Sequence, residues 1–470
     1  MDETLDSYDV VVIGAGSTGE NVAGRVAGHG MSVAIVESHL VGGDCSYYAC
    51  TPSKAMLRPP HVLAEARAVA GAREAATGTL SVDAVLERRD KFASHWKDDG
   101  QLPWLRDHGI DLVRGRGRLS GVREVTVETD AGVRVLDARR AVAICTGSDP
   151  LVPDIPGLRA AQPWTNREAI SAPRVPESLA VIGGGAVGVE LASAWKSLGA
   201  DVTMLVREER PLAKMETFAG DAVLGALREL GIWVVTETTV VEVDRKADGT
   251  VDVTLGDGAV VHAQEVLVAT GREPRTRDLG LEVVGLAPGE WIDVDDHLRV
   301  RAVAEGWLYA AGDVTHRALL THMGKYQARI CGDVIAAGDE GAASCPAAIA
   351  DSIAVTRVVF TDPEVASVGL SEAAARERKV NVKVVDFDIG QIAGARLHSD
   401  DYHGQARLVV DDDRHVIVGA TFVGRGVSEL LHSATIAIVG EVTLERLRHA
   451  VPAFPTISEI WLRLLETLGY

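Results

Sequence analysis

Two segments of the chain share one pattern of apolar and polar positions. Residues 11–37 read VVIGAGSTGENVAGRVAGHGMSVAIVE, and residues 180–206 read AVIGGGAVGVELASAWKSLGADVTMLV. Each begins with a β-branched apolar run, passes through a glycine cluster into an amphipathic stretch, and ends after a glycine turn in a second apolar run. The apolar runs predict buried strands, and the amphipathic stretch predicts a helix between them. The sequence therefore predicts one strand–helix–strand unit used twice.

The glycine clusters of the two segments have the same spacing, G-x-G-x-x-G. They stand in register without a gap at Gly14, Gly16 and Gly19 and at Gly183, Gly185 and Gly188. The first glycine makes the tight strand-to-helix turn, the second lets the backbone approach a pyrophosphate, and the third allows close helix–strand packing. One such motif is weak support. Two copies, each between a strand and a helix within about 30 residues, predict two dinucleotide-binding sites.

The two segments differ where a ribose would be held. The first ends in Glu37, a carboxylate placed to accept hydrogen bonds from a ribose 2′-hydroxyl. In the second, Val206 takes that register and is followed by Arg207, Arg210 and Lys214. Losing the carboxylate and gaining cations suits a 2′-phosphate, so the second site is predicted to prefer NADP to NAD. The alternative is that these cations only solvate a loop.

Length and composition bound the class of protein. A chain of 470 residues is too long for one hydrophobic core, so about three domains are expected. The formal net charge of −20 makes nucleic acid and anionic membranes poor partners. The polar start MDETLDSYDV does not resemble a signal peptide, and no apolar run approaches the roughly 20 residues of a membrane span. A cytoplasmic protein is expected.

Two of the five cysteines stand close together in a glycine-led segment. Cys45 and Cys50 lie in VGGDCSYYACTPSKAMLRPP, a C-x4-C spacing without the second pair that a zinc site needs. In a regular helix their Cα atoms would be about 8.7 Å apart, whereas a disulfide needs about 4.4–6.8 Å. If they bond, the Cys45 end must leave regular helix, and Gly42–Gly43 give that freedom. A helix start there would also lower a thiol pKa.

The segment GG-x-C-x4-C-x-P-S-K resembles the redox-active segment of the class I pyridine nucleotide-disulfide oxidoreductases. That family includes dihydrolipoyl dehydrogenase, glutathione reductase, mycothione reductase and mercuric reductase. Further matches follow in the order of that family, and the resemblance covers nearly the whole chain. They are TGS at residues 146–148, ATGR at 269–272 with Pro274, AGD at 311–313 and FTDPEVASVG at 360–369.

The resemblance implies an α/β fold with two Rossmann-like dinucleotide-binding domains and a C-terminal α/β dimerisation domain. The FAD-binding domain would be split between residues 1–150 and 277–345. The NAD(P)-binding domain would fill residues 151–276, and the dimerisation domain residues 346–470. A homodimer is implied, with each active site completed by the C-terminal segment of the partner.

The resemblance also implies roles for individual residues. Cys50 would lie against the flavin as the charge-transfer thiolate, and Cys45 would be the interchange thiol that meets the substrate. Lys54 would pair with Glu190 beside the flavin and polarise its ring. Glu37 would hold the adenosine ribose of FAD and Asp313 its ribityl chain. The other residues implied in cofactor binding are Gly43, Gly117, Thr146, Gly147 and Gly271.

The chain departs from the family pattern near its C-terminus. Members that reduce dithiol substrates carry H-P-T-x-S-E, whose histidine shuttles the thiol proton. Here residues 454–459 read FPTISE, so Phe454 takes the histidine's place while Glu459, which would orient that histidine, is kept. A missing general base costs about 10²–10⁴ in rate, so efficient turnover of lipoamide or glutathione disulfide is not expected. His449 is the alternative base, if its loop folds back.

A second departure is Tyr47-Tyr48 between the cysteines. These tyrosines either line a pocket or offer a hydroxyl donor or a stacking surface to a planar acceptor. Mercuric reductases carry a vicinal cysteine pair near the C-terminus, whereas the last cysteine here is Cys345. Efficient handling of mercuric ion is therefore not expected.

Three functions remain open at this stage. The first is an NADPH-dependent flavoprotein that reduces a disulfide or another small oxidant through Cys45 and Cys50. The second is a quinone reductase or diaphorase that uses a non-thiol acceptor. The third is a redox-sensing flavoprotein with little turnover. Quinones, dyes, oxidising metal ions and small activated disulfides all avoid the need for a thiol proton relay.

Overall fold

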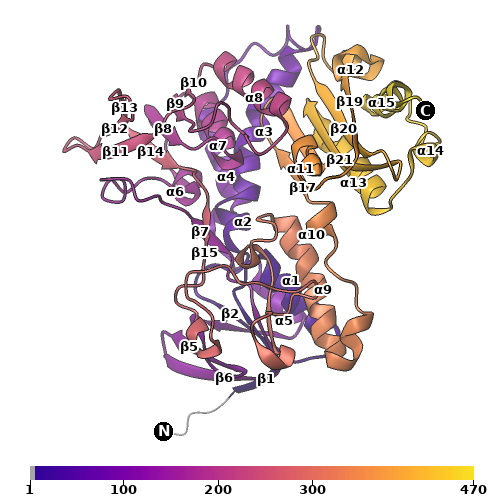
Figure 1. Cartoon of the computed structure of the whole chain (residues 1–470). Helices are drawn as coiled ribbons and strands as arrows, with labels where there is room; N and C mark the ends of the chain where they lie inside the picture. Colours follow the sequence, from indigo (N-terminus) through magenta and orange to yellow (C-terminus); the bar gives the residue numbers. More distant parts are fainter. Residues whose placement is uncertain (1–5) are drawn as a thin grey trace. The chain divides into compact units, whose positions relative to one another are not determined.

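The computed structural model describes residues 6–470, which form two compact units (Figure 1). Unit 1 contains the chain up to Pro52, Asp90–Leu151 and Arg272–Asp351. Unit 2 contains Ser53–Arg89, Val152–Gly271 and Ser352–Tyr470. Each unit is therefore assembled from three separate stretches of the chain.

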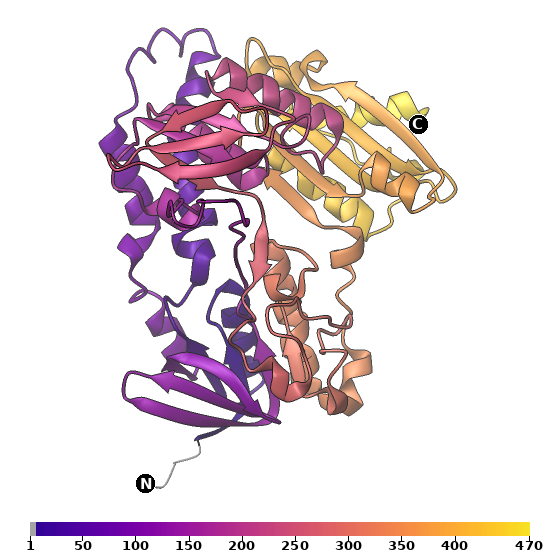
Figure 2. The same ribbon diagram turned by 60° about the vertical axis from the view of Figure 1, so that its left-hand side comes forward.

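Unit 1 is built on one seven-stranded sheet with the order β3-β2-β1-β6-β5-β4, in which β16 also pairs with β6. Strand β1 runs parallel to β2 and β6, while β4, β5 and β6 form an antiparallel meander, drawn in purple near the N-terminus in Figure 2. The strands are β1 Asp6–Ile13, β2 Val33–Glu37, β3 Ile110–Arg114, β4 Arg116–Gly121, β5 Glu124–Thr129, β6 Gly132–Ile144 and β16 Leu308–Ala310.

Helices α1 and α9 of unit 1 pack against each other, and α1 also packs on the central strands. Val10, Val11 and Val12 of β1 are completely buried, which is why a continuous β-branched run forms this strand. The helices are α1 Ser17–Gly28, α2 Gly43–Tyr47, α5 Leu102–Asp107 and α9 Thr321–Gly341. Two short strands, β7 Ser148–Pro150 and β15 Arg272–Pro274, pair antiparallel.

The first part of unit 2 repeats the strand–helix–strand unit. Its parallel sheet has the order β10-β9-β8-β14, and a three-stranded antiparallel sheet has the order β11-β12-β13. Trp195 of α7 is completely buried in the core of this unit, where its ring lies 6.0 Å from that of Trp164. The elements are α6 Asn166–Ser171, β8 Ser178–Ile182, α7 Ala186–Ser197, β9 Asp201–Leu205, α8 Thr217–Glu229, β10 Trp233–Val235, β11 Val240–Arg245, β12 Val251–Leu255, β13 Val260–Ala263 and β14 Glu265–Val268.

The C-terminal part of unit 2 is an antiparallel five-stranded sheet with the order β17-β18-β21-β20-β19. Phe422 of β21 is fully buried and packs edge-on against Trp461 of α15. The elements are β17 Thr356–Val359, β18 Glu364–Gly369, α11 Glu372–Glu377, β19 Val382–Asp388, α12 Ala393–His398, β20 Gln405–Asp411, β21 Val416–Gly424, α13 Leu431–Val439, α14 Leu444–Leu447 and α15 Ile460–Leu468. The remaining α-helices of the described residues are α3 Cys50–Arg67, α4 Val82–Phe92 and α10 Ala350–Ile353, and short 3-10 helices lie between the larger elements.

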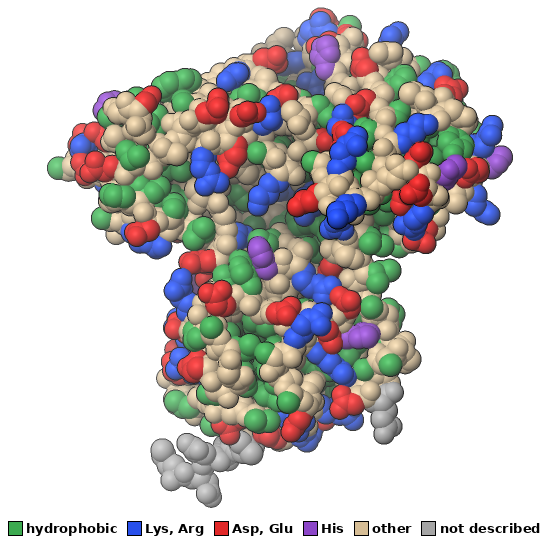
Figure 3. Space-filling view, viewed as in Figure 1, with side chains coloured by type: hydrophobic (Ala, Val, Ile, Leu, Met, Phe, Trp, Pro, Cys, Tyr) green, Lys and Arg blue, Asp and Glu red, His purple; other side chains and the backbone are tan. Residues whose placement is uncertain are grey.

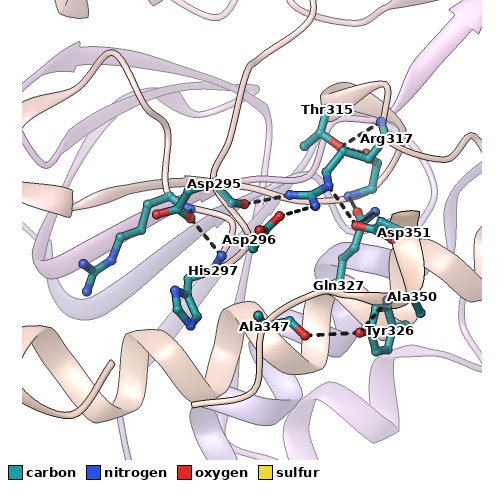
Figure 4. A network of polar contacts seen from close by, with 12 residues as sticks. Asp295, Asp296, His297, Thr315, Arg317, Tyr326, Gln327, Ala347, Ala350 and Asp351 are labelled. Atoms are coloured by element: carbon teal, nitrogen blue, oxygen red, sulfur yellow. Dashed lines mark hydrogen bonds and ion pairs between the residues drawn. The ribbon is translucent and has the colours of Figure 1, made fainter. Parts of the chain in front are cut away.

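A buried polar network in unit 1 fixes the AGD segment at residues 311–313 (Figure 4). The amide of Gly312 donates to Oε1 of Gln327, which is completely buried. Nε2 of Gln327 donates to the carboxylate of Asp351, and the Arg317 guanidinium forms an ion pair with the same carboxylate at 2.9 Å. Because each of these buried polar groups has a partner, the network ties the AGD segment to Gln327 of α9.

The α/β fold with two Rossmann-like units and a further C-terminal α/β region is confirmed. The residue bounds predicted for three domains remain a prediction, since the contacts divide the chain into two units only. On the face shown in Figure 3, acidic and basic side chains are interspersed. Within residues 6–470, no helix has both the length and the apolar character of a membrane span.

Candidate active site

The first glycine motif forms a turn that admits no side chains. Gly14 has φ +101°, and a Cβ there would lie 2.6 Å from the carbonyl oxygen of Cys145. A Cβ on Gly19 would lie 1.8 Å from the carbonyl oxygen of Gly14. Gly16 caps α1 without a side-chain hydrogen bond, so the first amides of the helix remain available to an anion.

The second motif repeats this geometry in unit 2. Gly183 has φ +118°, and a Cβ on Gly188 would lie 2.3 Å from the carbonyl oxygen of Gly183. Gly185 caps α7 with φ −77° and ψ 178°, nearly the same values as Gly16 before α1, with φ −74° and ψ 178°. The internal repeat of the sequence is therefore a repeat of backbone conformation.

Glu37 ends β2 beside the first motif. Its carboxylate accepts hydrogen bonds from the amides of Ala15 and His39, at 2.8 and 2.7 Å. Gly43 approaches the same turn closely, because a Cβ on it would lie 2.8 Å from Cα of Gly16. A Cβ on Gly117 of β4 would lie 2.9 Å from a methyl group of Val36 of β2.

The two cysteines of the C-x4-C segment lie on different helices of the chain. Cys45 is in the five-residue helix α2, and Cys50 is the first residue of α3. The break between the helices falls at residues 48–49, and Gly42 and Gly43 have φ +111° and +65°. Both thiols are half-buried, and neither forms a disulfide in this structure. The Cys45 end therefore leaves the long helix, as a disulfide would require.

Thr321, the first residue of α9, contacts the cysteine pair. Its Oγ1 lies 3.2 Å from Sγ of Cys50. Hydrogen bonding to Cys50 and burial raise the pKa of the Cys45 thiol, and hydrogen bonding to Thr321 and the charge of Lys325 partly oppose this. The sequence predicted a lowered thiol pKa near this helix start, so the direction at Cys45 differs from that expectation.

Lys54 and Glu190 form an ion pair within unit 2. Nζ of Lys54 lies 2.6 Å from Oε2 of Glu190, whose side chain is only 7% exposed. Oε1 of Glu190 accepts from the amide of Phe360, and Nζ of Lys54 lies 4.9 Å from the centroid of the Phe360 ring. The carboxylate is thus fully engaged, which a buried charge requires. Lys54 is four residues after Cys50 in α3, so both side chains project from one face of the helix.

Asp313 belongs to a second polar cluster, in unit 1. The Ser148 hydroxyl donates to its carboxylate at 2.7 Å, and Arg272 donates to the Ser148 hydroxyl and carbonyl oxygens. Arg272 also lies 3.6 Å from the carboxylate of Asp44, the residue before Cys45. Arg272 therefore connects the TGS, ATGR and AGD motifs with the redox segment.

The residues predicted to select the nucleotide lie on the surface of unit 2. Val206 is buried, whereas the Arg207 side chain is 79% exposed and pairs with Glu208. Lys214 is also exposed.

Gly271 of the ATGR segment has φ +152°, a conformation that favours glycine.

The C-terminal FPTISE segment has one exposed and one buried end. The Phe454 side chain is 75% exposed, and Glu459 is buried. Oε1 of Glu459 accepts from Arg463, while Oε2 has no hydrogen-bond partner among the described residues. His449 is exposed. The backbone amide of His449 donates to the carbonyl oxygen of Arg446, but no hydrogen bond or ion pair of the His449 side chain is recorded among the described residues.

The two tyrosines between the cysteines differ in environment. Tyr47 is 1% exposed, and its hydroxyl donates to the carbonyl oxygen of Val41, which identifies it as a packing residue. Tyr48 is half-buried, and its ring stacks on that of His39 at 6.0 Å. Of the two, only Tyr48 offers a surface for stacking.

Comparison with known proteins decides the family. Residues 8–341 match the pyridine nucleotide-disulphide oxidoreductases, and residues 355–464 match their dimerisation domain. The chain belongs to this family. It is 30% identical over 459 residues to a mercuric reductase of Staphylococcus aureus, covering 96% of this chain and 81% of the relative. It is 30% identical over 472 residues to the dihydrolipoyl dehydrogenase of the same organism, covering 98% and 97%.

A solved structure has the same fold. The Cu(II) complex of the HOCl-induced flavoprotein disulfide reductase RclA from Escherichia coli superposes with a TM-score of 0.84. The superposition covers 99% of this chain and 100% of RclA, at 23% sequence identity. At that identity the likeness establishes the fold of this family member and nothing of its substrate.

Membership of this oxidoreductase family implies FAD and a pyridine nucleotide. Both glycine turns fit this, because each leaves a helix N-terminus open to a pyrophosphate. In unit 1, Oγ1 of Thr146 is buried without a partner among the described residues, beside Gly147 with φ +75°. A buried hydroxyl in that position is a ready donor to a bound group. Among residues 6–470, no cluster of three or more metal-ligating side chains is present.

Two residues of the site were not found from the sequence. Thr321 stands 271 positions from Cys50, and no motif signals that the N-terminus of α9 reaches the thiols. Arg272 was noted only as part of ATGR, although it contacts three other segments of unit 1. Neither side chain has a role that local spacing could reveal, because tertiary packing creates both contacts.

Proposed function

We propose that this family member passes electrons from NADPH through FAD to the Cys45–Cys50 pair, and from there to a small oxidant. The observation that carries the proposal is the placement of both thiols at helix starts, within hydrogen-bonding reach of each other and of Thr321. Helix N-termini and a hydroxyl donor stabilise a thiolate, and the thiolate is the reactive form of cysteine. Cys50 is the thiolate of the pair and Cys45 the exchanging thiol.

FAD, when bound, would supply the two-electron redox chemistry that links the nicotinamide with the thiols. The chain's own residues position the groups. The turn at Gly14, Gly16 and Gly19 holds the FAD pyrophosphate, Glu37 its adenosine ribose, and Asp313 with Thr146 the part nearer the ring. The Lys54–Glu190 pair places a fixed positive charge on the same helix face as Cys50, where it favours the arrival of negative charge.

NADPH is the proposed nucleotide because of the surface after β9. Arg207 is 79% exposed, and only the neighbouring Glu208 pairs with it among the described residues. An exposed ion pair of this kind contributes about 1 kcal/mol or less to stability. Arg207 can therefore leave Glu208 and bind a 2′-phosphate at little cost. Lys214 adds a second cation on the same surface loop.

The acceptor follows from what the C-terminal segment lacks. Phe454 cannot carry a proton, so acceptors that need no proton from that position are favoured. A small activated disulfide meets this condition because its leaving thiol has a low pKa. Oxidising metal ions meet it too: one relative is a mercuric reductase, and the RclA structure is that of a Cu(II) complex.

A homodimer is proposed from the dimerisation-domain match over residues 355–464. Val451 and Phe454 are 84% and 75% exposed in the single chain. Two large apolar side chains so close together in an exposed loop are expected to be covered by a second copy. Glu459, with one oxygen unpaired, would then meet the partner's active site.

Anaerobic reduction of the holoenzyme with NADPH, and separately with NADH, tests the electron path. We expect a long-wavelength thiolate–flavin band after two electrons, and faster reduction with NADPH. Cys45→Ser should keep the band and lose disulfide turnover. If the flavin bleaches without any band in the wild type, the cysteines are outside the path.

The second candidate is a quinone reductase or diaphorase that uses the same flavin. The half-buried, stacked Tyr48–His39 pair favours it, because stacked rings give a planar acceptor a surface. Full quinone turnover by Cys45→Ser would select this candidate. Loss of all turnover in that variant would select the dithiol path.

A further inference from the structure

The loop of residues 206–216, between β9 and α8 of unit 2, is anchored on the second glycine turn. The amide of Leu212 donates to the carbonyl oxygen of Gly184 at 2.8 Å. A Cβ on Gly184 would lie 3.2 Å from Cα of Pro211, so the two backbones are in close approach. Leu212 is buried with φ +54°, a conformation that a leucine keeps only where its surroundings hold it. The loop therefore has a fixed contact with the turn that is proposed to bind the nucleotide.

The same loop has a second anchor at its other end, where Glu216 precedes α8. The Glu216 side chain is buried, and its Oε1 accepts from the amide of Glu372 at 2.8 Å. Its Oε2 accepts from Nη1 of Arg407 at 3.0 Å. Glu372 begins α11 and Arg407 lies on β20, so both partners belong to the C-terminal part of unit 2. The C-terminal sheet thus holds the end of the loop.

Arg407 binds three carboxylates at once. Nη1 also donates to Glu372 at 2.9 Å, while Nε and Nη2 donate to the two carboxylate oxygens of Asp386 at 2.7 Å each. The Arg407 side chain is 18% exposed, and its guanidinium lies 5.3 Å from the centroid of the Phe218 ring of α8. Without this cation, the buried Glu216 carboxylate would keep one amide donor and would lie near two like charges, which is costly. The end of the loop would then move toward solvent.

The cations proposed to select NADPH lie on this loop. Lys214 is exposed, whereas Leu212 and Glu216, two residues to either side, are both buried. The two anchors therefore limit where the Lys214 ammonium can lie. Arg207, at the start of the loop, is exposed and follows the buried Val206. A loop that is already ordered loses less conformational entropy when it binds a ligand.

We propose that Arg407 is a positioning residue for NADPH. Through Glu216 it holds the loop so that Lys214 and Arg207 meet the 2′-phosphate, although Arg407 itself contacts no part of the nucleotide. This inference rests on the proposed function, in which NADPH is the reductant. It adds that residues of the C-terminal sheet, about 200 positions further along the chain, determine the choice of nucleotide.

The test measures the binding of NADP⁺ and NAD⁺ to the oxidised, FAD-loaded enzyme by isothermal titration calorimetry, so that no electron transfer takes place. Arg407→Met should weaken NADP⁺ binding about tenfold, the effect of losing about one charge-assisted contact. NAD⁺ binding should stay within about twofold, because NAD⁺ has no 2′-phosphate for the loop to bind. Arg407→Lys keeps the charge and should restore part of the NADP⁺ affinity. Flavin absorbance and thermal melting show whether each variant is folded.

Two further variants separate the path through Glu216 from a general effect on the sheet. Glu216→Gln keeps the side-chain volume and loses the charge, and it should show the same selective loss at smaller size. Arg407→Met added to Glu216→Gln should cause little further loss, because the two residues act as one unit. Arg414→Met is the control, since it breaks only exposed pairs with Asp411 and Glu441 beyond the end of β20. It should change neither affinity by more than about twofold.

Unchanged NADP⁺ binding in Arg407→Met, or equal losses for NADP⁺ and NAD⁺, would overturn the positioning role. Fully additive losses in the double variant would show that Arg407 does not act through Glu216. If Arg407→Met does not fold, Glu216→Gln decides by the same criterion. Failure of the proposed function is visible in the wild type alone: if it binds NAD⁺ as tightly as NADP⁺, the preference for NADPH is wrong, and the role of Arg407 fails with it.

Discussion

Sγ of Cys50 and Oγ1 of Thr321 lie 3.2 Å apart, although 271 residues separate them in the chain. Cys50 begins α3 and Thr321 begins α9, so the partial positive ends of two long helices meet at one sulfur. The buried Gln327–Asp351–Arg317 network holds the loop that leads into α9. The thiolate environment is thus set by residues outside the C-x4-C segment.

Removing the Thr321 hydroxyl should raise the pKa of Cys50. A hydrogen bond to a charged group contributes about 1.5–3 kcal/mol, and about 1.4 kcal/mol corresponds to one pKa unit. We expect Thr321→Val to raise the Cys50 pKa by about one to two units, measured from thiolate ultraviolet absorbance in the reduced enzyme. Thr321→Ser keeps the hydroxyl and is the control. An unchanged titration in Thr321→Val would mean that the hydroxyl does not bond to the thiolate.

Adding a methyl group at Gly19 should abolish FAD retention. A Cβ on residue 19 would lie 1.8 Å from the carbonyl oxygen of Gly14, so the turn would have to open. The backbone amides would then no longer be placed to bind the pyrophosphate. Gly28→Ala, at the other end of α1, meets nothing within 4 Å and should leave FAD content unchanged while stabilising the helix by up to about 1 kcal/mol. Flavin absorbance per protein, with thermal melting, checks both variants. A flavin-replete Gly19→Ala protein would show that the turn does not bind the cofactor.

Breaking the Lys54–Glu190 pair should destabilise the protein. Lys54→Met leaves the buried Glu190 carboxylate with only the Phe360 amide, at a cost of about 1–3 kcal/mol because Lys54 is itself a third exposed. Arg58→Met, one turn further along α3, breaks an exposed pair with Glu65 and should cost about 0.5 kcal/mol or less. Chemical denaturation of the two variants measures the difference. Equal midpoints would show that the buried pair contributes no more than the surface pair.

Removing Arg207 should reduce the preference for NADPH. An exposed guanidinium that contacts the 2′-phosphate contributes about 1.4–2.7 kcal/mol, which is about a 10- to 100-fold change in Kd. We expect Arg207→Ala to weaken NADPH binding by that factor and to leave NADH binding within about twofold. Arg228→Ala, on the exposed side of α8, is the matched control. Parallel losses for both nucleotides in Arg207→Ala would place the arginine outside the 2′-phosphate site.

The sequence alone determined the repeated strand–helix–strand units and the position of both glycine turns. These depend on residues close together in the chain, where backbone sterics allow few alternatives: no side chain fits at Gly14, Gly19, Gly183 or Gly188. The family resemblance also carried the expectation that Lys54 pairs with Glu190, and the two side chains do meet in unit 2.

Only the tertiary structure decided which side chains lie near the thiols and how burial and neighbouring charges shift the pKa values there. The contact between Thr321 and Cys50, and the effect of the Lys325 charge on the pKa of Cys45, depend on how α9 packs along α1. No local spacing in the sequence encodes that packing. Burial raises the pKa of Glu20, and the charge of Glu37 adds to this, whereas in the sequence Glu20 is one acid among 67. Local patterns fix the backbone, but proton affinities depend on burial and neighbouring charges, and only the folded chain supplies those.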